Sequence, residues 1–453
     1  MKIVANSLNK LCATFEHLYM QEQVNQIKTM LSPALSGIGK DVLKTKGDKV
    51  IWGLVVLLTL ASLVLVYSST GSLAYRMSKS NESYLFKQFA FIVLGFVIIY
   101  FAHRINYTVY SRIALILFLI SIPLLIYTLL FGVQLNAGTR WIKLPVINMT
   151  FQTSDLAKLG LFMYLSRMLS RKQKVIKDLK KGFLPIIIPV LIICGLVVPA
   201  NLSTAILIGG TSFILMFIGR ANIKHLGVVM GIGTILAVLL LFLAVATYDK
   251  QKEEMKDLPA VLSWGRVPTW LSRVQTQIYS EGQKNSDKAY QINQAKIAIA
   301  KGGWLGLGPG YSEQRNFLPH SYSDFIYAII IEEYGLLGGA VVLFIYLWFL
   351  FRCIRVFKKC PFAFGAFLAL ALSFTLVIQA MTNMAVNVGI FPNTGVTLPL
   401  LSMGGSSFLF TCMSIGIILS VARNVEQQEG GQVPIEEKAL TEAVDEENEN
   451  EHR

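Results

Sequence analysis

Ten long apolar stretches constrain this chain more than any other feature of its sequence. A helix needs about 20 apolar residues to cross the ~30 Å hydrocarbon core of a bilayer, and backbone groups in lipid must be paired within the segment. With 54% hydrophobic and 15% charged residues, the sequence predicts an all-α polytopic membrane protein with about ten transmembrane helices. The stretches are 49–68, 85–102, 111–131, 153–169, 183–199, 202–219, 225–246, 324–351, 362–386 and 401–422.

The basic residues indicate how these helices are oriented. Lys and Arg outnumber Asp and Glu by 41 to 27, and they gather in the short loops that follow the even-numbered stretches. Because cytoplasmic loops are enriched in Lys and Arg, both termini are predicted to be cytoplasmic. The same distribution favours membrane topology over nucleic-acid binding as the explanation of the formal charge of +14.

Three regions follow from this topology. Residues 1–48 are mixed and polar, and we expect a cytoplasmic N-terminal extension there in preference to a secretory signal or a membrane-surface anchor. Residues 49–422 form the transmembrane domain, with a large extracytoplasmic loop at 247–323 between the seventh and eighth helices. Residues 423–453 are acidic and almost free of aromatic side chains, which predicts a disordered cytoplasmic tail.

The large outer loop carries patterns of its own. Its segments WGRVPTWLSRVQTQI and YQINQAKIAIAKGGW place apolar residues at helical spacing, so short amphipathic helices are expected on the outer surface. The glycine-rich run GLGPG at 306–310 is too short to indicate a nucleotide-binding loop.

Ionisable residues near the membrane are the first candidates for function. A charged side chain in lipid costs at least ~2.5 kcal/mol, so one that persists needs a partner or a wet cavity. Asp155 and Lys158 are three residues apart, on one helix face near the outer end of the fourth stretch. They form either a structural ion pair or a substrate contact. Asp324 begins the eighth stretch, where the hydroxyl of Ser323 can cap the helix and the helix N-terminus favours a negative charge, so helix capping is the structural alternative to a functional role for Asp324.

Two further acids, Glu332 and Glu333, lie inside the eighth stretch. In one straight helix they would be about 12–14 Å deeper than Asp324, with Glu332 turned by about 80° and Glu333 nearly opposite. We therefore expect them to pair within the helix bundle, apart from the site of Asp324.

Polar side chains also gather in the outer loops, where an anionic substrate would be met. Arginine suits phosphate oxygens because it forms bidentate hydrogen bonds. The candidates for substrate binding in and beside these loops are Arg140, Arg273, Gln291, Gln294, Arg315, Ser323 and Asn387.

Four stretches resemble the SEDS family (shape, elongation, division and sporulation) of polytopic peptidoglycan glycosyltransferases. They read RWIKLP with FQTSDLAKL, YQINQAKIAIAKGGWLGLGPGYSEQRNFLPHSYSDFIYAIIIEEYG, NVGIFPNTGVTLPLLSMGGSS, and PANLSTA. The resemblance covers about 47–424 and is greatest to the cell-division members. His320, Tyr322 and Asn201 depart from the family pattern, so no acidic role carries over to positions 201 and 320.

The resemblance implies a function and a site. Asp324 corresponds to the family's acid that is essential for polymerase activity, and Asp155 and Lys158 correspond to its Glu and Lys in the fourth helix. The implied activity is polymerisation of lipid II on the outer face of the bacterial cytoplasmic membrane, at the division septum. Asp324 is then expected to act as the base, or to hold the acceptor hydroxyl through a water or a metal ion, while Lys158 and the loop arginines neutralise the pyrophosphate leaving group.

Other expectations accompany this one. The sequence contains no dedicated metal cage, and a divalent cation (Mg²⁺ or Mn²⁺) is the one cofactor that pyrophosphate chemistry suggests. The implied partners are lipid II, a class B penicillin-binding transpeptidase and other division proteins, with no nucleic acid. A lipid II flippase and a division scaffold are the alternative functions, and an elongation role stays open beside division.

Overall fold

The computed structural model describes residues 47–71, 81–135, 138–143, 150–249, 254–255, 267–279, 287–319 and 321–429. Contacts between Cα atoms divide the chain into a unit of Met1–Lys49 and a unit of Val50–Arg453, and the fold below is that of the second unit. The N-terminal extension and most of the predicted tail lie outside the described residues.

All ten predicted apolar stretches are helical. Eight helical segments in the described ranges are long and apolar enough to cross a membrane, by length and composition. α6 and the shorter α8 are not among the eight, so the number of spans stays a prediction. The helices are α2 (Lys49–Ser69), α4 (Asn81–Arg104), α5 (Tyr107–Phe131), α6 (Thr153–Arg171), α7 (Leu184–Val197), α8 (Leu202–Ile218), α9 (Ile223–Ala246), α12 (Ile326–Lys359), α13 (Ala363–Asn387) and α14 (Ser406–Glu429).

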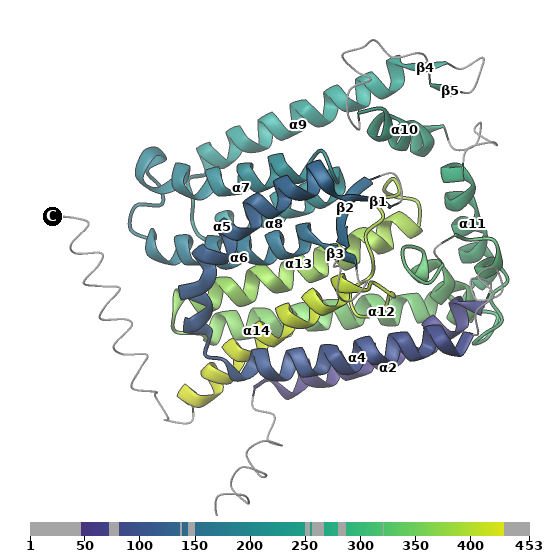
Figure 1. Cartoon of the computed structure of the whole chain (residues 1–453), viewed down its shortest axis with the longest axis horizontal. Coiled ribbons are helices and arrows are strands. Elements are labelled where there is room, and N and C mark those ends of the chain that lie inside the picture. Colours follow the sequence, from purple (N-terminus) through teal and green to yellow (C-terminus); the bar gives the residue numbers. More distant parts are fainter. Residues whose placement is uncertain are drawn as a thin grey trace, which may run out of the picture. The chain divides into compact units, whose positions relative to one another are not determined.

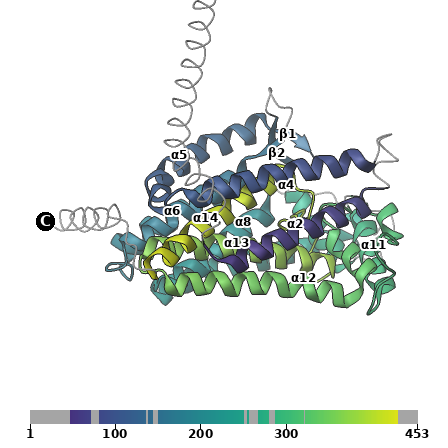
Figure 2. The same cartoon turned by 90° about the horizontal axis from the view of Figure 1, so that it is seen from below.

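Helix α13 is the centre of the bundle. It packs against α6, α8, α12 and α14, and it is the most buried of the candidate spans, whereas α9 is the least buried and lies along one edge (Figure 1). α4 runs beside α14 (Figure 2). Small residues permit this close approach, because a Cβ at Gly95 would lie 2.6 Å from Cys412 Sγ and one at Gly416 would lie 2.6 Å from Ala102 Cβ.

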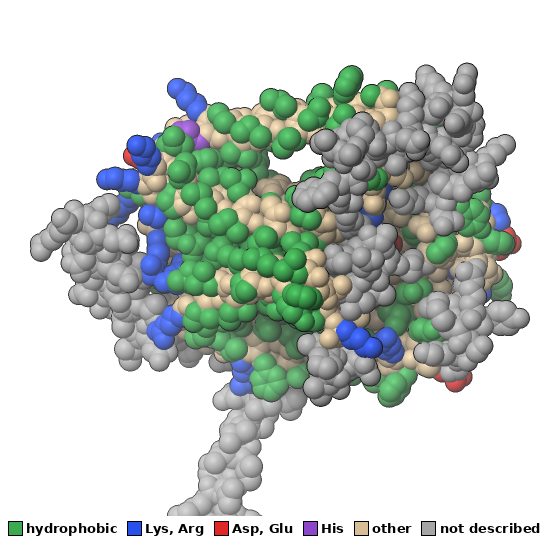
Figure 3. All heavy atoms as spheres, turned by 45° about the horizontal axis from the view of Figure 1, so that its top comes forward, with side chains coloured by type: hydrophobic (Ala, Val, Ile, Leu, Met, Phe, Trp, Pro, Cys, Tyr) green, Lys and Arg blue, Asp and Glu red, His purple; other side chains and the backbone are tan. Residues whose placement is uncertain are grey.

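The ends of the helices differ in charge. Lys and Arg side chains gather at one end, on the left of Figure 3, which we call the basic end. They come from the turns between helices and from the helix termini there, and the predicted cytoplasmic orientation of this end stays a prediction. The residues that define the basic end are Arg104, Arg112, Arg171, Lys172, Lys174, Lys177, Lys180, Lys181, Arg220, Lys224, Arg352, Arg355, Lys358 and Lys359.

The opposite end carries the predicted outer loops. The two expected amphipathic helices are present as α10 (Val267–Ile278) and α11 (Asp287–Gly302). The sequence analysis did not predict strands, yet three short antiparallel ones form a sheet in the order β1-β2-β3, and β4 pairs with β5. In the first sheet Val133 faces Trp141, which faces Gln152. The strands are β1 (Val133–Leu135), β2 (Gly138–Lys143), β3 (Thr150–Gln152), β4 (Tyr248–Asp249) and β5 (Glu254–Met255).

Helix α12 is broken near its start. Gly335 has φ 71° and ψ −177°, which is not a helical conformation. The hydroxyl of Tyr327 donates to the carbonyl of Gly339 at 3.2 Å, although twelve residues would span about 18 Å in one continuous helix. The segment 326–334 therefore folds back along 336–359, and the two form a helical hairpin.

This hairpin corrects the predicted positions of the two glutamates. The longer half, 336–359, runs from the turn to the basic end, and Tyr327 lies beside Gly339, one turn along it. Asp324 is therefore closer to the basic end than Glu332 and Glu333, which lie at the turn. The prediction that the glutamates lie deeper than Asp324 is wrong, because the chain reverses where the apolar pattern continues.

Candidate active site

The main chain around Asp324 is held by α13. The side-chain amide of Asn383 donates to the Asp324 carbonyl at 2.9 Å, and that of Asn387 donates to the same oxygen at 3.0 Å. The Asn387 amide oxygen accepts from the N–H of Ala328 at 3.1 Å. Both asparagines are only 1% exposed, so they fix the backbone from inside the protein.

The side chain of Asp324 is half-buried, and the residue before it, Ser323, contacts the segment 396–403. The hydroxyl of Ser323 donates to Asp324 Oδ1 at 2.9 Å, and the hydroxyl of Ser402 donates to the Ser323 carbonyl at 2.7 Å. The prediction that Ser323 caps the helix is wrong, since its hydroxyl is directed to the neighbouring carboxylate. The helix begins after Phe325, which makes no side-chain cap.

Tyr322 adds a second hydroxyl near this carboxylate. Its backbone carbonyl accepts from the N–H of Met403 at 3.1 Å. Burial raises the pKa of the Tyr322 hydroxyl, and nearby Tyr84 and Asp324 raise it further. Tyr322 therefore stays protonated at neutral pH, as a neutral donor in the surroundings of Asp324.

Asp155 and Lys158 form the predicted pair at the start of α6. Lys158 Nζ lies 3.2 Å from Asp155 Oδ1 and donates to Gln379 Oε1, also at 3.2 Å. Asp155 is 3% exposed, and its Oδ2 has no hydrogen-bond partner within the described part of the chain. A small pocket with a cavity volume of about 10 Å³ adjoins the pair and is lined on its other side by α13 and α14.

One face of α13 contacts both Lys158 and the backbone of Asp324. Gln379 donates to the carbonyl of Thr397 at 3.0 Å, and Asn383 donates to the carbonyl of Val396 at 2.7 Å. Gln379, Asn383 and Asn387 are four residues apart, so they lie on one helix face. Gln379 and Asn383 were not among the residues predicted from the sequence. Their detectable signal was three amides at spacing four in an apolar helix.

The far end of the hairpin is anchored to the outer loop through Glu332. This carboxylate is fully buried and accepts a hydrogen bond from the hydroxyl of Ser312. It also accepts from the backbone N–H groups of Glu313 and Gln314, each at 3.1 Å. Glu332 therefore holds the loop rather than a group in the bundle core.

Glu333 and Arg315 meet at the end of α2. The Ser68 hydroxyl donates to the Glu333 carboxylate, which confirms that this acid pairs within the bundle. Arg315 Nη1 donates to the Ser68 carbonyl at 2.9 Å. At this position Arg315 ties the outer loop to α2, and a direct contact with substrate stays a prediction.

The glycine-rich segment 303–308 pairs the backbone groups that the break leaves free. This segment contains part of the GLGPG run at 306–310, which is too short to indicate a nucleotide-binding loop. It lies beside residues 332–337. The four hydrogen bonds join Leu307 N to Glu332 O, Gly308 N to Glu333 O and Leu336 N to Gly303 O at 2.9 Å, and Leu337 N to Trp304 O at 3.4 Å.

The remaining predicted residues are spread over the loop elements. Arg140 belongs to β2 and its side chain lies outside the described residues, while Arg273 belongs to α10. Gln291 and Gln294 are on α11, where Gln291 Oε1 accepts from Asn393 Nδ2 at 3.3 Å. Their contacts with substrate stay predictions.

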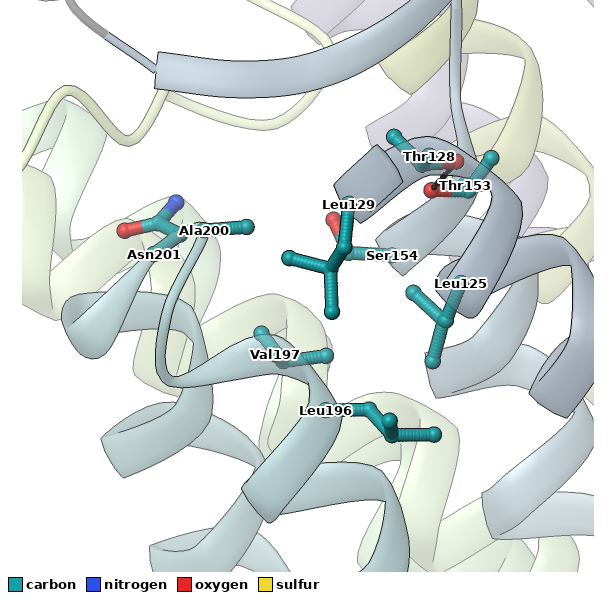
Figure 4. Close-up of a pocket in the computed structure, with 9 residues that line it drawn as sticks. All are labelled: Leu125, Thr128, Leu129, Thr153, Ser154, Leu196, Val197, Ala200 and Asn201. Carbon is teal, nitrogen blue, oxygen red and sulfur yellow. Dashed lines mark hydrogen bonds between the residues drawn. The ribbon is translucent and has the colours of Figure 1, made fainter. Parts of the chain in front are cut away.

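A second small pocket, with a cavity volume of about 10 Å³, lies among α5, α6 and the α7–α8 turn (Figure 4). The Thr128 hydroxyl donates to that of Thr153 at 3.0 Å on one side of it. Asn201 is at the other side, and its Oδ1 points away from the other labelled side chains and has no partner among the described residues. The pocket is lined mainly by apolar groups.

Over the ranges that the structure describes, no group of three or more His, Cys, Asp or Glu side chains could hold a metal ion. A divalent cation that arrives with a substrate phosphate stays a prediction, since such an ion takes part of its ligands from the substrate.

Together these features define a class of protein: a polytopic membrane protein with a carboxylate site held between a broken helix and a central helix. The chain belongs to the FtsW/RodA/SpoVE family of cell cycle proteins, whose family model matches residues 48–427. The protein is therefore a bacterial membrane protein of this family.

Relatives at about 30% identity span most of the chain. The probable peptidoglycan glycosyltransferase FtsW of Thioalkalivibrio sulfidiphilus is 33% identical over 80% of this chain and 86% of its own. FtsW of Trichlorobacter lovleyi is 30% identical over 84% and 94%. Stage V sporulation protein E of Bacillus subtilis is also 30% identical, over 84% and 98%.

Two solved structures share the fold. A chain of a peptidoglycan synthase complex that coordinates polymerization and crosslinking has a TM-score of 0.65 at 24% identity, and covers 84% of this chain and 99% of its own. The rod shape determining protein RodA of Thermus thermophilus has a TM-score of 0.56 at 22% identity, over 83% and 97%.

Proposed function

We propose that this protein is a peptidoglycan glycosyltransferase that polymerises lipid II into glycan strands during septal wall synthesis. The observation that carries the proposal is the backbone clamp on Asp324. α13 and the 396–403 segment hold the chain on both sides of a half-buried carboxylate, in a chain whose relatives are named peptidoglycan glycosyltransferases.

The reaction joins two lipid-linked saccharides. The 4-hydroxyl of one lipid II disaccharide attacks the anomeric carbon of the growing chain, and the bond from that carbon to undecaprenyl pyrophosphate breaks. The α-linked donor becomes a β-linked glycan, so the step inverts. It needs one group to take the hydroxyl proton and others to stabilise the leaving pyrophosphate.

The site residues divide this work. Asp324 takes the proton from the attacking hydroxyl, while Ser323 orients the carboxylate through its hydrogen bond to Oδ1. Lys158 neutralises the charge of the pyrophosphate. Asp155 and Gln379 hold its ammonium group in place. A divalent cation bound with the substrate would screen the same charge.

The loop residues complete the proposed substrate site. Binding of the saccharide and phosphate groups is assigned to Arg140, Arg273, Gln291, Gln294 and Arg315. The chemistry takes place at the outer face of the cytoplasmic membrane, with both termini cytoplasmic. The proposed partners are a class B penicillin-binding transpeptidase and other division proteins, by analogy with the synthase complex that shares the fold.

The test is polymerisation of purified lipid II by detergent-solubilised protein. Wild type should form glycan polymer, and Asp324→Asn should form none while it keeps the wild-type melting temperature. Asp178→Asn is the matched control, since Asp178 accepts from backbone N–H groups of Lys180 and Lys181 at the basic end. Polymer formation by Asp324→Asn at the wild-type rate would exclude the role as base.

The same experiment separates the enzyme from the flippase. A transporter needs a membrane to cross, so polymer made in detergent supports the enzyme. Wild-type protein that makes no polymer, but moves lipid II across reconstituted vesicles, would instead support the transport function. A scaffold would do neither.

A further inference from the structure

We propose that Asn387, together with Asn383, positions Asp324 for catalysis without touching the substrate. The inference rests on the proposed glycosyltransferase function. It changes the expected role of Asn387, which the sequence placed among the substrate-binding candidates.

The Asn387 side chain bridges two points of the chain on either side of the helix start. Its Nδ2 donates to the Asp324 carbonyl at 3.0 Å, and its Oδ1 accepts from the Ala328 N–H at 3.1 Å. N–H groups in the first turn of a helix lack partners four residues earlier, and the Ala328 N–H is shared between the Phe325 carbonyl at 3.1 Å and the Asn387 side chain. One amide thus ties the residue before the helix to its first turn.

Asn383 supports the same carbonyl from one turn earlier on α13. Its Nδ2 donates to the Asp324 carbonyl at 2.9 Å and to the Val396 carbonyl at 2.7 Å. Asn387 Nδ2 donates in addition to the Asn383 carbonyl at 2.8 Å. The two amides therefore join α13, the 396–397 segment and the start of the hairpin.

Burial separates the asparagines from the substrate. Both are 1% exposed and their amides are occupied by protein groups, whereas Asp324 is half-buried. Any effect of these residues on the reaction must therefore pass through the protein groups that they hold, of which the Asp324 carbonyl is the one that both asparagines share. The Cα–Cβ direction of Asp324 follows from that backbone, and a shift of about 1 Å at a reacting group can cost about 100-fold in rate.

If Asn387 positions Asp324 without touching the substrate, its substitution should change kcat but not KM. Asn387→Ala should lower kcat for lipid II polymerisation by about 10- to 100-fold, and KM should stay close to that of wild type because no substrate contact is lost. Asn383→Ala should act in the same direction. Asn387→Asp keeps the volume and the acceptor for Ala328, but it replaces the amide donor by a buried carboxylate that faces the Asp324 and Asn383 carbonyl oxygens, so it should lower both kcat and the melting temperature.

The matched control is Asn222→Ala. Asn222 accepts from the N–H of Lys224 at the start of α9, at the basic end, so this variant removes an amide with a helix-capping role and should keep the wild-type kcat. Melting temperatures in detergent are measured for all variants. If Asn387→Ala does not fold, Asn383→Ala, which removes the other amide donor to the same carbonyl, decides by the same criteria.

Each outcome has one meaning. A lower kcat at unchanged KM and unchanged control supports the inference. A wild-type kcat in Asn387→Ala, or a raised KM with kcat preserved, overturns it while the proposed function stands. If wild-type protein makes no polymer, the proposed function fails and the inference fails with it.

Discussion

A methyl group at position 335 tests whether the start of α12 is a hairpin. Gly335 lies at φ 71° and ψ −177°, a combination that is essentially restricted to glycine. A Cβ there would lie 2.2 Å from the Trp304 carbonyl oxygen and 2.6 Å from the Gly306 nitrogen. Because these are backbone atoms, the segment 303–308 must move for Gly335→Ala to fit.

The methyl group of Gly335→Ala should lower the free energy of unfolding in two ways. The backbone conformation contributes about 1–3 kcal/mol of strain. Displacement of 303–308 threatens its four hydrogen bonds to 332–337, each worth about 0.5–1.5 kcal/mol net. With two of them lost, Gly335→Ala should lower the free energy of unfolding by about 2–6 kcal/mol, a large share of the 5–15 kcal/mol that is usual.

The assay is thermal unfolding of purified protein in detergent, followed by lipid II polymerisation of the folded fraction. Gly231→Ala is the control, because Gly231 lies within α9 and no heavy atom lies within 4 Å of its Cβ position. Alanine there should leave stability unchanged or raise it by up to about 1 kcal/mol. A Gly335→Ala protein with the wild-type melting temperature and rate would refute the hairpin.

Two further predictions concern charge. Lys158→Met leaves the carboxylate of Asp155 buried without its cation and should lower stability by about 3–5 kcal/mol, which Asp155→Asn in the same chain should largely restore. If the melting temperature recovers but polymerisation does not, Lys158 contacts substrate; recovery of both would make the pair structural. The second prediction concerns the outer loop, where a hydrogen bond between Glu313 and Lys301 lowers the pKa of Glu313 and raises the pKa of Lys301. The Glu313 contribution to stability is therefore present above about pH 4.3 and is lost as pH falls through the lowered pKa of Glu313. The Lys301 contribution is present below about pH 10.4 and is lost as pH rises through the raised pKa of Lys301. When the melting temperature of Lys301→Met is measured against pH, both losses should be absent.

Several parts of the site were accessible from the sequence. Asp155 and Lys158 pair as predicted because a spacing of three residues is a local property of a helix. The prediction for Ser323 failed because the helix begins after Phe325, two residues later than a cap at Ser323 requires, and the Ser323 hydroxyl donates to the adjacent Asp324 carboxylate. Asn383 was missed because its partner, the Asp324 carbonyl, is 59 residues away along the chain.

The sequence by itself determined the class of fold, the helical stretches, the basic end and the residue types of the site. These features follow from the length of the apolar runs and the placement of the charged residues, because helix formation is local and the membrane selects apolar segments. Only the tertiary structure decided that Gly335 reverses the chain inside a continuous apolar run, since that reversal depends on the distant segment 303–308 to pair the freed backbone groups. That reversal puts Glu332 and Glu333 at the turn and leaves Asp324 against α13, where amides four residues apart hold it.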